Sequence, residues 1–260
     1  MQPEELVSFH ERGWVRLSSA FDARAASAMC EVVWSALADI GVTRDRPSTW
    51  TVQRPSHLQA VKSDPAFSAV GSPSVLAAVS AVLDSRAFAI PQNWGALFLA
   101  FPSRQTWGIP ARGWHVDAKY TAPLVPATGV KTLALLADVA PRSGATQILG
   151  GSHRLIHQWF KANPPPGRAR SADMRKLLLA HPYIGDLHRD GDPDARVARF
   201  MARAEEWDGV ALQVAEATGS AGDVILMHPL TLHVAAPNAG SAPRFMLSGG
   251  VTLDQWGWAG

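Results

Sequence analysis

The chain has 260 residues, of which 47% are hydrophobic and 18% charged, and its formal net charge is +2. This length predicts one domain, residues 1–260, with a core of its own, and the lack of a Lys/Arg run argues against nucleic-acid binding. No apolar run approaches the roughly 20 residues that a membrane helix needs, and the N-terminus does not resemble a signal peptide. The single cysteine, Cys30, excludes an intramolecular disulfide, which favours a cytoplasmic location.

The first third of the chain, residues 1–86, is predicted to be a mainly helical scaffold. Apolar side chains recur there at helical spacing in three stretches, and a fourth, short stretch alternates like a strand. Asp22 and Ser72 are suited to cap the second and third helices, and a proline follows Ser72. The predicted elements are helices at 3–12, 22–40 and 72–82 and a strand at 14–17.

From residue 87 the pattern changes to short β-type runs separated by Gly, Pro and Asn. Several short strands at this density predict a mainly β core over residues 87–253, in the form of a sandwich, a barrel or a jelly roll. The predicted strands are 87–91, 94–101, 114–118, 130–139, 145–149, 211–217, 223–227, 231–235 and 244–253.

Residues 154–208 interrupt the run of strands. This stretch predicts helices at 171–180 and 194–206, with a polar turn at 185–194 between them. A long, partly helical insertion at the mouth of a barrel is a suitable place for a lid or a substrate-selecting element.

His115 and Asp117 are the first candidate functional residues. Side chains two residues apart on a strand share a face, and an imidazole with a carboxylate is two-thirds of the 2-His-1-carboxylate site that holds non-haem Fe(II). The alternative is a buried histidine that hydrogen-bonds to a neighbouring carboxylate, so the metal interpretation requires a second histidine later in the chain. A second His-x-Asp pair, His188 and Asp190, lies in a Gly/Asp-rich stretch that is typical of a solvated loop.

Three stretches carry a resemblance to a known family. They are Trp114-His115-Val116-Asp117, then Leu135 to Asp138 followed by Ser143 to Arg154, and finally Gly222 to His233 followed by Ala236-Pro237-Asn238 and Pro243-Arg244. In this order the chain resembles the phytanoyl-CoA dioxygenase family of Fe(II)/2-oxoglutarate-dependent oxygenases. The resemblance implies a double-stranded β-helix, which is a cupin-like jelly roll, with N-terminal helices.

The resemblance also implies the site residues and the chemistry. His115, Asp117 and His233 would bind Fe(II), and Arg244 would pair with the distal carboxylate of the cosubstrate 2-oxoglutarate, because a guanidinium matches a carboxylate bidentately. With dioxygen, such an enzyme hydroxylates a small-molecule substrate or otherwise oxidises it by hydrogen abstraction, here in specialised metabolite biosynthesis. His228 competes with His233 as the third ligand, but the spacing to Arg244 favours His233.

Two positions depart from the family pattern. Ala235 stands where related proteins often have a serine that helps to hold the cosubstrate, and Leu133 stands where they often have a tryptophan. Lys131 would lie on the same strand face as Leu133, and it is the candidate cofactor-binding residue to compensate. Because Asp117 is a carboxylate rather than Gly or Ala, the open chloride site of related halogenases is not expected.

Trp107, Trp114 and Trp159 are candidates to line a substrate pocket, with packing in the core or in a lid as the alternative for each. The competing function is a cupin-like protein that binds a ligand or metal without redox turnover. We find neither the Gly-x-Ser-x-Gly turn of a serine hydrolase nor the Gly-x-Gly-x-x-Gly of a dinucleotide-binding fold.

Overall fold

The fold was examined in a computed structural model. The structure describes residues 1–51, 55, 58–85, 87–118, 124, 127–164 and 171–253. Part of the predicted insertion, residues 165–170, therefore lies outside the described residues.

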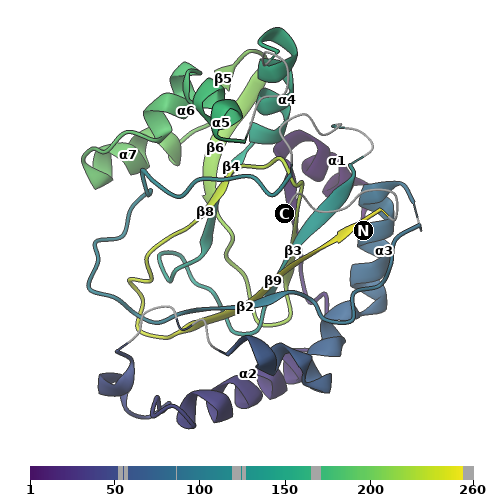
Figure 1. Cartoon of the computed structure of the whole chain (residues 1–260), viewed down its shortest axis with the longest axis vertical. Coiled ribbons are helices and arrows are strands. Elements are labelled where there is room, and N and C mark those ends of the chain that lie inside the picture. The colour runs from purple at the N-terminus through teal and green to yellow at the C-terminus, as the bar shows by residue number, and fades with distance from the viewer. Residues whose placement is uncertain are drawn as a thin grey trace.

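Two antiparallel sheets form a jelly roll that does not close into a barrel (Figure 1). The larger sheet has the order β1 (Trp14–Leu17), β7 (Val224–Met227), β3 (Gly129–Leu135), β9 (Arg244–Thr252) and β2 (Ala96–Ala100). The smaller sheet has the order β5 (Glu205–Trp207), β6 (Val210–Glu216), β4 (Thr146–Gly150) and β8 (His233–Ala235). This confirms the predicted fold class.

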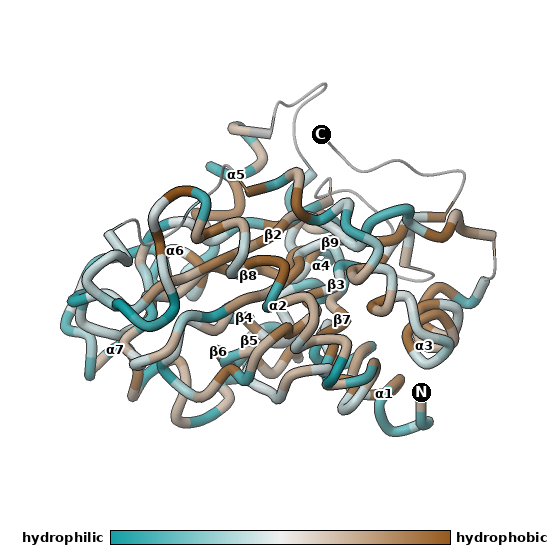
Figure 2. Tube along the Cα trace, turned by 90° about the horizontal axis from the view of Figure 1, so that it is seen from below, coloured by the Kyte–Doolittle hydropathy of each residue, from teal (hydrophilic) through white to brown (hydrophobic). Residues whose placement is uncertain are grey.

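Alternate side chains of the larger sheet belong to two different cores. Leu133, Ile225 and Met246 pack with Ile148 of the smaller sheet, and they form the interior of the roll. Their neighbours along the strands face the N-terminal helices instead. Because most of both faces is covered, these strands are rich in hydrophobic residues, and Figure 2 shows hydrophobic residues along the strands at the centre of the molecule.

Helices α2 (Ala23–Ala38) and α3 (Pro73–Leu83) cover the outer face of the larger sheet, while α1 (Pro3–Arg12) packs beside β1. The Asp22 carboxylate accepts from the Arg24 N–H and the Ser72 hydroxyl accepts from the Val75 N–H, so both predicted caps form. Short 3-10 helices lie between α2 and α3, at Pro47–Thr49, Gln59–Ser63 and Pro65–Gly71. Among the described residues no single helix could cross a membrane; only the bent pair Pro65–Gly71 and Pro73–Leu83 has the length and composition when joined.

The insertion packs on the outer face of the smaller sheet. It contains α4 (Ser152–Ala162), α5 (Ser171–Leu179), α6 (Pro182–Leu187) and α7 (Pro193–Phe200). Side chains of α4, α6 and α7 share a core with outward-facing residues of the sheet such as Leu149, Val214 and Val234. The described part of the insertion therefore covers a sheet face.

Several secondary-structure predictions need correction. The predicted turn 185–194 begins inside α6, and the predicted helix 194–206 ends at Phe200, after which β5 forms. Helix α4 was not predicted at all. The predicted strand 87–91 is reduced to a single bridge between Phe88 and Leu253.

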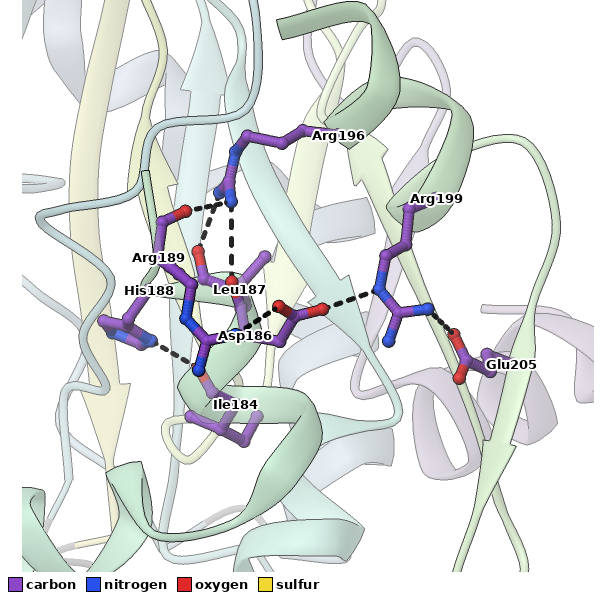
Figure 3. A network of polar contacts seen from close by, with 8 residues as sticks. All are labelled: Ile184, Asp186, Leu187, His188, Arg189, Arg196, Arg199 and Glu205. Atoms are coloured by element: carbon purple, nitrogen blue, oxygen red, sulfur yellow. Dashed lines mark hydrogen bonds and ion pairs between the residues drawn. The ribbon is translucent and has the colours of Figure 1, made fainter. Parts of the chain in front are cut away.

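Arg196 of α7 joins the insertion to the segment that leads to His115. Figure 3 shows its contacts with residues at the end of α6. Its buried guanidinium donates to the carbonyls of Leu187 (2.7 Å) and Arg189, at the end of α6, and to the Ile109 carbonyl (3.2 Å). One side chain thus holds the end of a helix and a distant loop together.

Candidate metal centre

His115 and Asp117 lie on a segment that runs beside β8 without forming a regular strand. His115 and His233 exchange backbone hydrogen bonds, at 3.1 and 3.0 Å, in an isolated antiparallel bridge. Two residues later the Asp117 N–H donates to the Pro229 carbonyl at 2.9 Å, which is not a partner in the same ladder. The predicted strand 114–118 is therefore wrong, because the left-handed Gly113 before it (φ +91°) and the turn at 228–231 keep the pairing to one bridge.

The structure nevertheless brings His115, Asp117 and His233 together. Each side chain offers one ligand atom, and these atoms lie within 4.8 Å of one another. His233 Nε2 is 3.6 Å from Asp117 Oδ2. A single metal ion could contact all three residues after small side-chain movements.

Both imidazoles are oriented by the backbone. Nδ1 of His115 lies 2.9 Å from the Gly113 carbonyl, and Nδ1 of His233 lies 3.0 Å from the Thr231 carbonyl. A carbonyl can only accept, so Nδ1 carries the proton of each neutral ring and Nε2 keeps its lone pair for a metal.

Burial lowers the pKa of His233, and the neighbouring His115 lowers it further, against the opposing effect of Asp117. His233 is therefore neutral near pH 7, which is the state that binds metal. Asp117 Oδ2 is buried and accepts no hydrogen bond of good geometry, and its nearest described cation is the Lys131 ammonium at 3.0 Å. Two imidazoles with Nε2 directed away from the backbone and one carboxylate are a ligand set that fits a divalent transition metal such as iron.

Lys131 of β3 is the contact that the sequence did not indicate. Its ammonium lies 3.0 Å from Asp117 Oδ2, at ion-pair distance. The sequence shows a single lysine within an apolar predicted strand, which suggests a charged partner, but only the fold shows that this partner is Asp117. Leu133, two residues along, is buried in the interior of the roll.

Arg244 begins β9 and is only 3% exposed. Its side chain shares the inner face of the sheet with Met246, and Nη1 lies 3.7 Å from the Met246 sulfur. Lys131 pairs with Gly250, six residues after Arg244, which separates the two backbone positions by roughly 20 Å along the strand. Lys131 and Arg244 therefore lie at different places along the sheet, and the role of Lys131 in compensating for Ala235 and Leu133 stays a prediction.

The contacts that the structure describes for the three tryptophans are packing contacts, which is the alternative left open in the sequence. Trp114 is buried in the core beneath the insertion, and its Nε1 donates to the Pro110 carbonyl at 2.7 Å. Trp159 packs on the same core, where its Nε1 donates to Leu177. Trp107 lies beneath the Arg142 guanidinium at 4.9 Å.

The competing histidines have other roles. His228 stacks near His153 with a ring separation of 5.1 Å, and its Nδ1 accepts from the Leu230 N–H. Burial lowers the pKa of His228 to about 3. His188 bonds through Nδ1 to the carbonyl of Ile184, and the exposed Asp190 pairs with Arg112.

Comparison with known proteins gives one family and several similar structures. A sequence profile described as phytanoyl-CoA dioxygenase (PhyH) matches residues 9–246. No curated protein matches the chain. The chain is similar in structure to AviO1 from Streptomyces viridochromogenes Tue57, with 17% identity, a TM-score of 0.59 and coverage of 99% of this chain and 97% of that chain.

Two further solved structures are similar over most of their length. One is the non-haem α-ketoglutarate-dependent carbocyclase SnoK from nogalamycin biosynthesis, with 15% identity, a TM-score of 0.59 and coverage of 97% and 84% of the two chains. The other is HygX from Streptomyces hygroscopicus, solved with nickel and 2-oxoglutarate bound, with 15% identity, a TM-score of 0.58 and coverage of 98% and 88%. At these identities the likeness establishes the fold.

Proposed function

Because the chain belongs to the phytanoyl-CoA dioxygenase family, we propose that it is an Fe(II)- and 2-oxoglutarate-dependent oxygenase that acts on a small molecule. The observation that carries the proposal is the meeting of His115, Asp117 and His233 on one centre, with both Nε2 atoms free to bind. HygX, solved with nickel and 2-oxoglutarate, supports the choice of cosubstrate.

His115, Asp117 and His233 would hold the iron. When bound, the iron, 2-oxoglutarate and dioxygen supply the oxidation that removes a hydrogen atom from the substrate. The buried guanidinium of Arg244 would pair with the distal carboxylate of the cosubstrate, because a fixed planar donor pair matches a carboxylate. The backbone carbonyls on the two Nδ1 atoms hold the imidazoles in the tautomer that binds metal.

The substrate is proposed to be a small molecule of specialised metabolism, and the product a hydroxylated or otherwise oxidised form of it. SnoK is described as a carbocyclase and SnoN as an epimerase, both from nogalamycin biosynthesis, so related folds carry out more than one reaction on such molecules.

The test is succinate formation from 2-oxoglutarate by metal-free protein that receives Fe(II) under air. We expect slow, iron-dependent succinate release from the wild type and its loss in His115→Ala and Asp117→Ala. His10→Ala, which removes an exposed histidine of α1, is the matched control and should retain the wild-type rate. Full turnover in the two ligand variants would contradict the proposal, and 2-oxoglutarate binding without succinate would instead favour a protein that only binds ligands.

A further inference from the structure

Lys131 faces the carboxylate oxygen of Asp117 that also faces His233. Its Nζ lies 3.0 Å from Asp117 Oδ2, and His233 Nε2 lies 3.6 Å from the same oxygen. The lysine ammonium is therefore a positive charge beside the carboxylate that would bind the metal.

Both partners are well placed to interact strongly. The side chains of Lys131 and Asp117 are 18% and 19% exposed, so the surrounding water screens the pair only in part. Among the described residues, no hydrogen-bond donor competes with the lysine for Asp117 Oδ2. In the metal-free protein the ammonium thus supplies the positive charge that this carboxylate needs.

The lysine side chain has four rotatable bonds, so its charge can move away from Asp117 without any change in the backbone. Its cross-strand neighbours are Gly250 on β9 and Met227 on β7.

We propose that Lys131 is a tethered cation that competes with the metal for Asp117: it pairs with the carboxylate in the metal-free protein and is displaced when the metal binds. This inference rests on the proposed metal site. A divalent ion bound to Asp117 would lie a few ångströms from the ammonium, and two cations at that separation repel measurably even in water. Lys131 is thus a positioning residue that limits the affinity for metal.

The test is the dissociation constant for Mn(II) alone, measured by titrating metal-free protein and following the free ion by electron paramagnetic resonance. Lys131→Met is expected to bind Mn(II) at least about tenfold more tightly than the wild type, since the repulsion and the competing ion pair are both removed. Lys131→Arg retains the charge and should stay within about threefold of the wild type. Lys161→Met, which removes an exposed positive charge on α4, is the control for net charge and should not change the constant.

Circular dichroism of each metal-free variant checks that it is folded, and Lys131→Gln repeats the measurement should the methionine variant not fold. An unchanged or weaker Mn(II) affinity in the uncharged variants would overturn the inference. Lys131 would then have no effect on the metal affinity, or it would help Asp117 to bind the metal. Failure of the metal site itself has a different signature, in which Asp117→Ala binds Mn(II) as well as the wild type; that result would overturn both the site and the inference.

Discussion

Replacement of Arg196 by methionine tests whether one buried guanidinium joins the helical insertion to the segment before the metal site. The guanidinium donates to the carbonyls of Leu187, Arg189 and Ile109, and Arg196 is 8% exposed. Methionine fills a similar volume but donates no hydrogen bond.

The size of the effect follows from these contacts. Three hydrogen bonds from a charged donor at about 1.5 kcal/mol each give roughly 4.5 kcal/mol. Part of this is offset, since the variant no longer buries a charged group, so we expect Arg196→Met to lower the free energy of unfolding by about 3 kcal/mol. Arg196→Lys retains the charge but lacks the planar set of donors, and it should fall between the methionine variant and the wild type.

Equilibrium unfolding in urea measures this free energy, and Arg199→Met is the matched control. Arg199 lies on the same helix, 42% exposed, and pairs with Asp186 at 2.7 Å and with Glu205 at 3.3 Å (Figure 3). Exposed pairs of this kind contribute about 0.5 kcal/mol each. Equal losses for Arg196→Met and Arg199→Met, with equal slopes in urea, would refute the argument.

Three further expectations concern other parts of the chain. Arg244→Met should raise the 2-oxoglutarate KM about a hundredfold while leaving the Mn(II) affinity within threefold, because it removes a charged carboxylate partner but no metal ligand; equal losses of both would count against the assignment. The pKa of His228 is lowered in the folded protein to about 3, so the unfolded chain takes up the proton first as the pH falls below about 6.5. Stability should therefore decrease by about 1.4 kcal/mol per pH unit from this residue between about pH 6.5 and 3, and urea unfolding of His228→Gln at pH 7 and 5 should show a smaller decrease. Gly13→Ala should cost at least about 2 kcal/mol, because a Cβ there would lie 2.4 Å from Thr231 Oγ1 at φ +78°, whereas Gly41→Ala, at φ +82° with nothing within 4 Å, should cost about 1 kcal/mol in thermal or urea unfolding.

The elements that could be predicted from the sequence are those with local signals. Asp22 and Ser72 cap the helices that follow them because a cap needs only its own side chain and the next N–H groups. The strand predicted at 244–253 is β9 almost to the residue, since Pro243 before it and the apolar residues Phe245, Met246, Leu247 and Val251 within it mark a strand.

The elements that were missed depend on the rest of the fold or are too short. Helix α4 follows two glycines that indicated a turn, although Leu155, Ile156 and Phe160 recur at a spacing that fits a helix. Helix α6 has six residues, too few for any periodicity.

The predictions for the candidate site were also right in part. Residue types and motif order singled out the three side chains that meet. His233 lies on the predicted strand, in β8, whereas the strand predicted around His115 and Asp117 was wrong, because that segment forms only one bridge. The core into which Trp114 packs, and the carboxylate that Lys131 faces, depend on segments more than ten residues away. Composition cannot supply either.

The two backbone hydrogen bonds between His115 and His233 bear on how a metal could be removed from this centre and replaced. The peptide groups set the separation of the two rings, so the backbone, and not a bound ion, maintains the arrangement of the ligands. A chelator should therefore remove the metal without unfolding the protein, and cobalt could then be bound by the same residues as a spectroscopic probe.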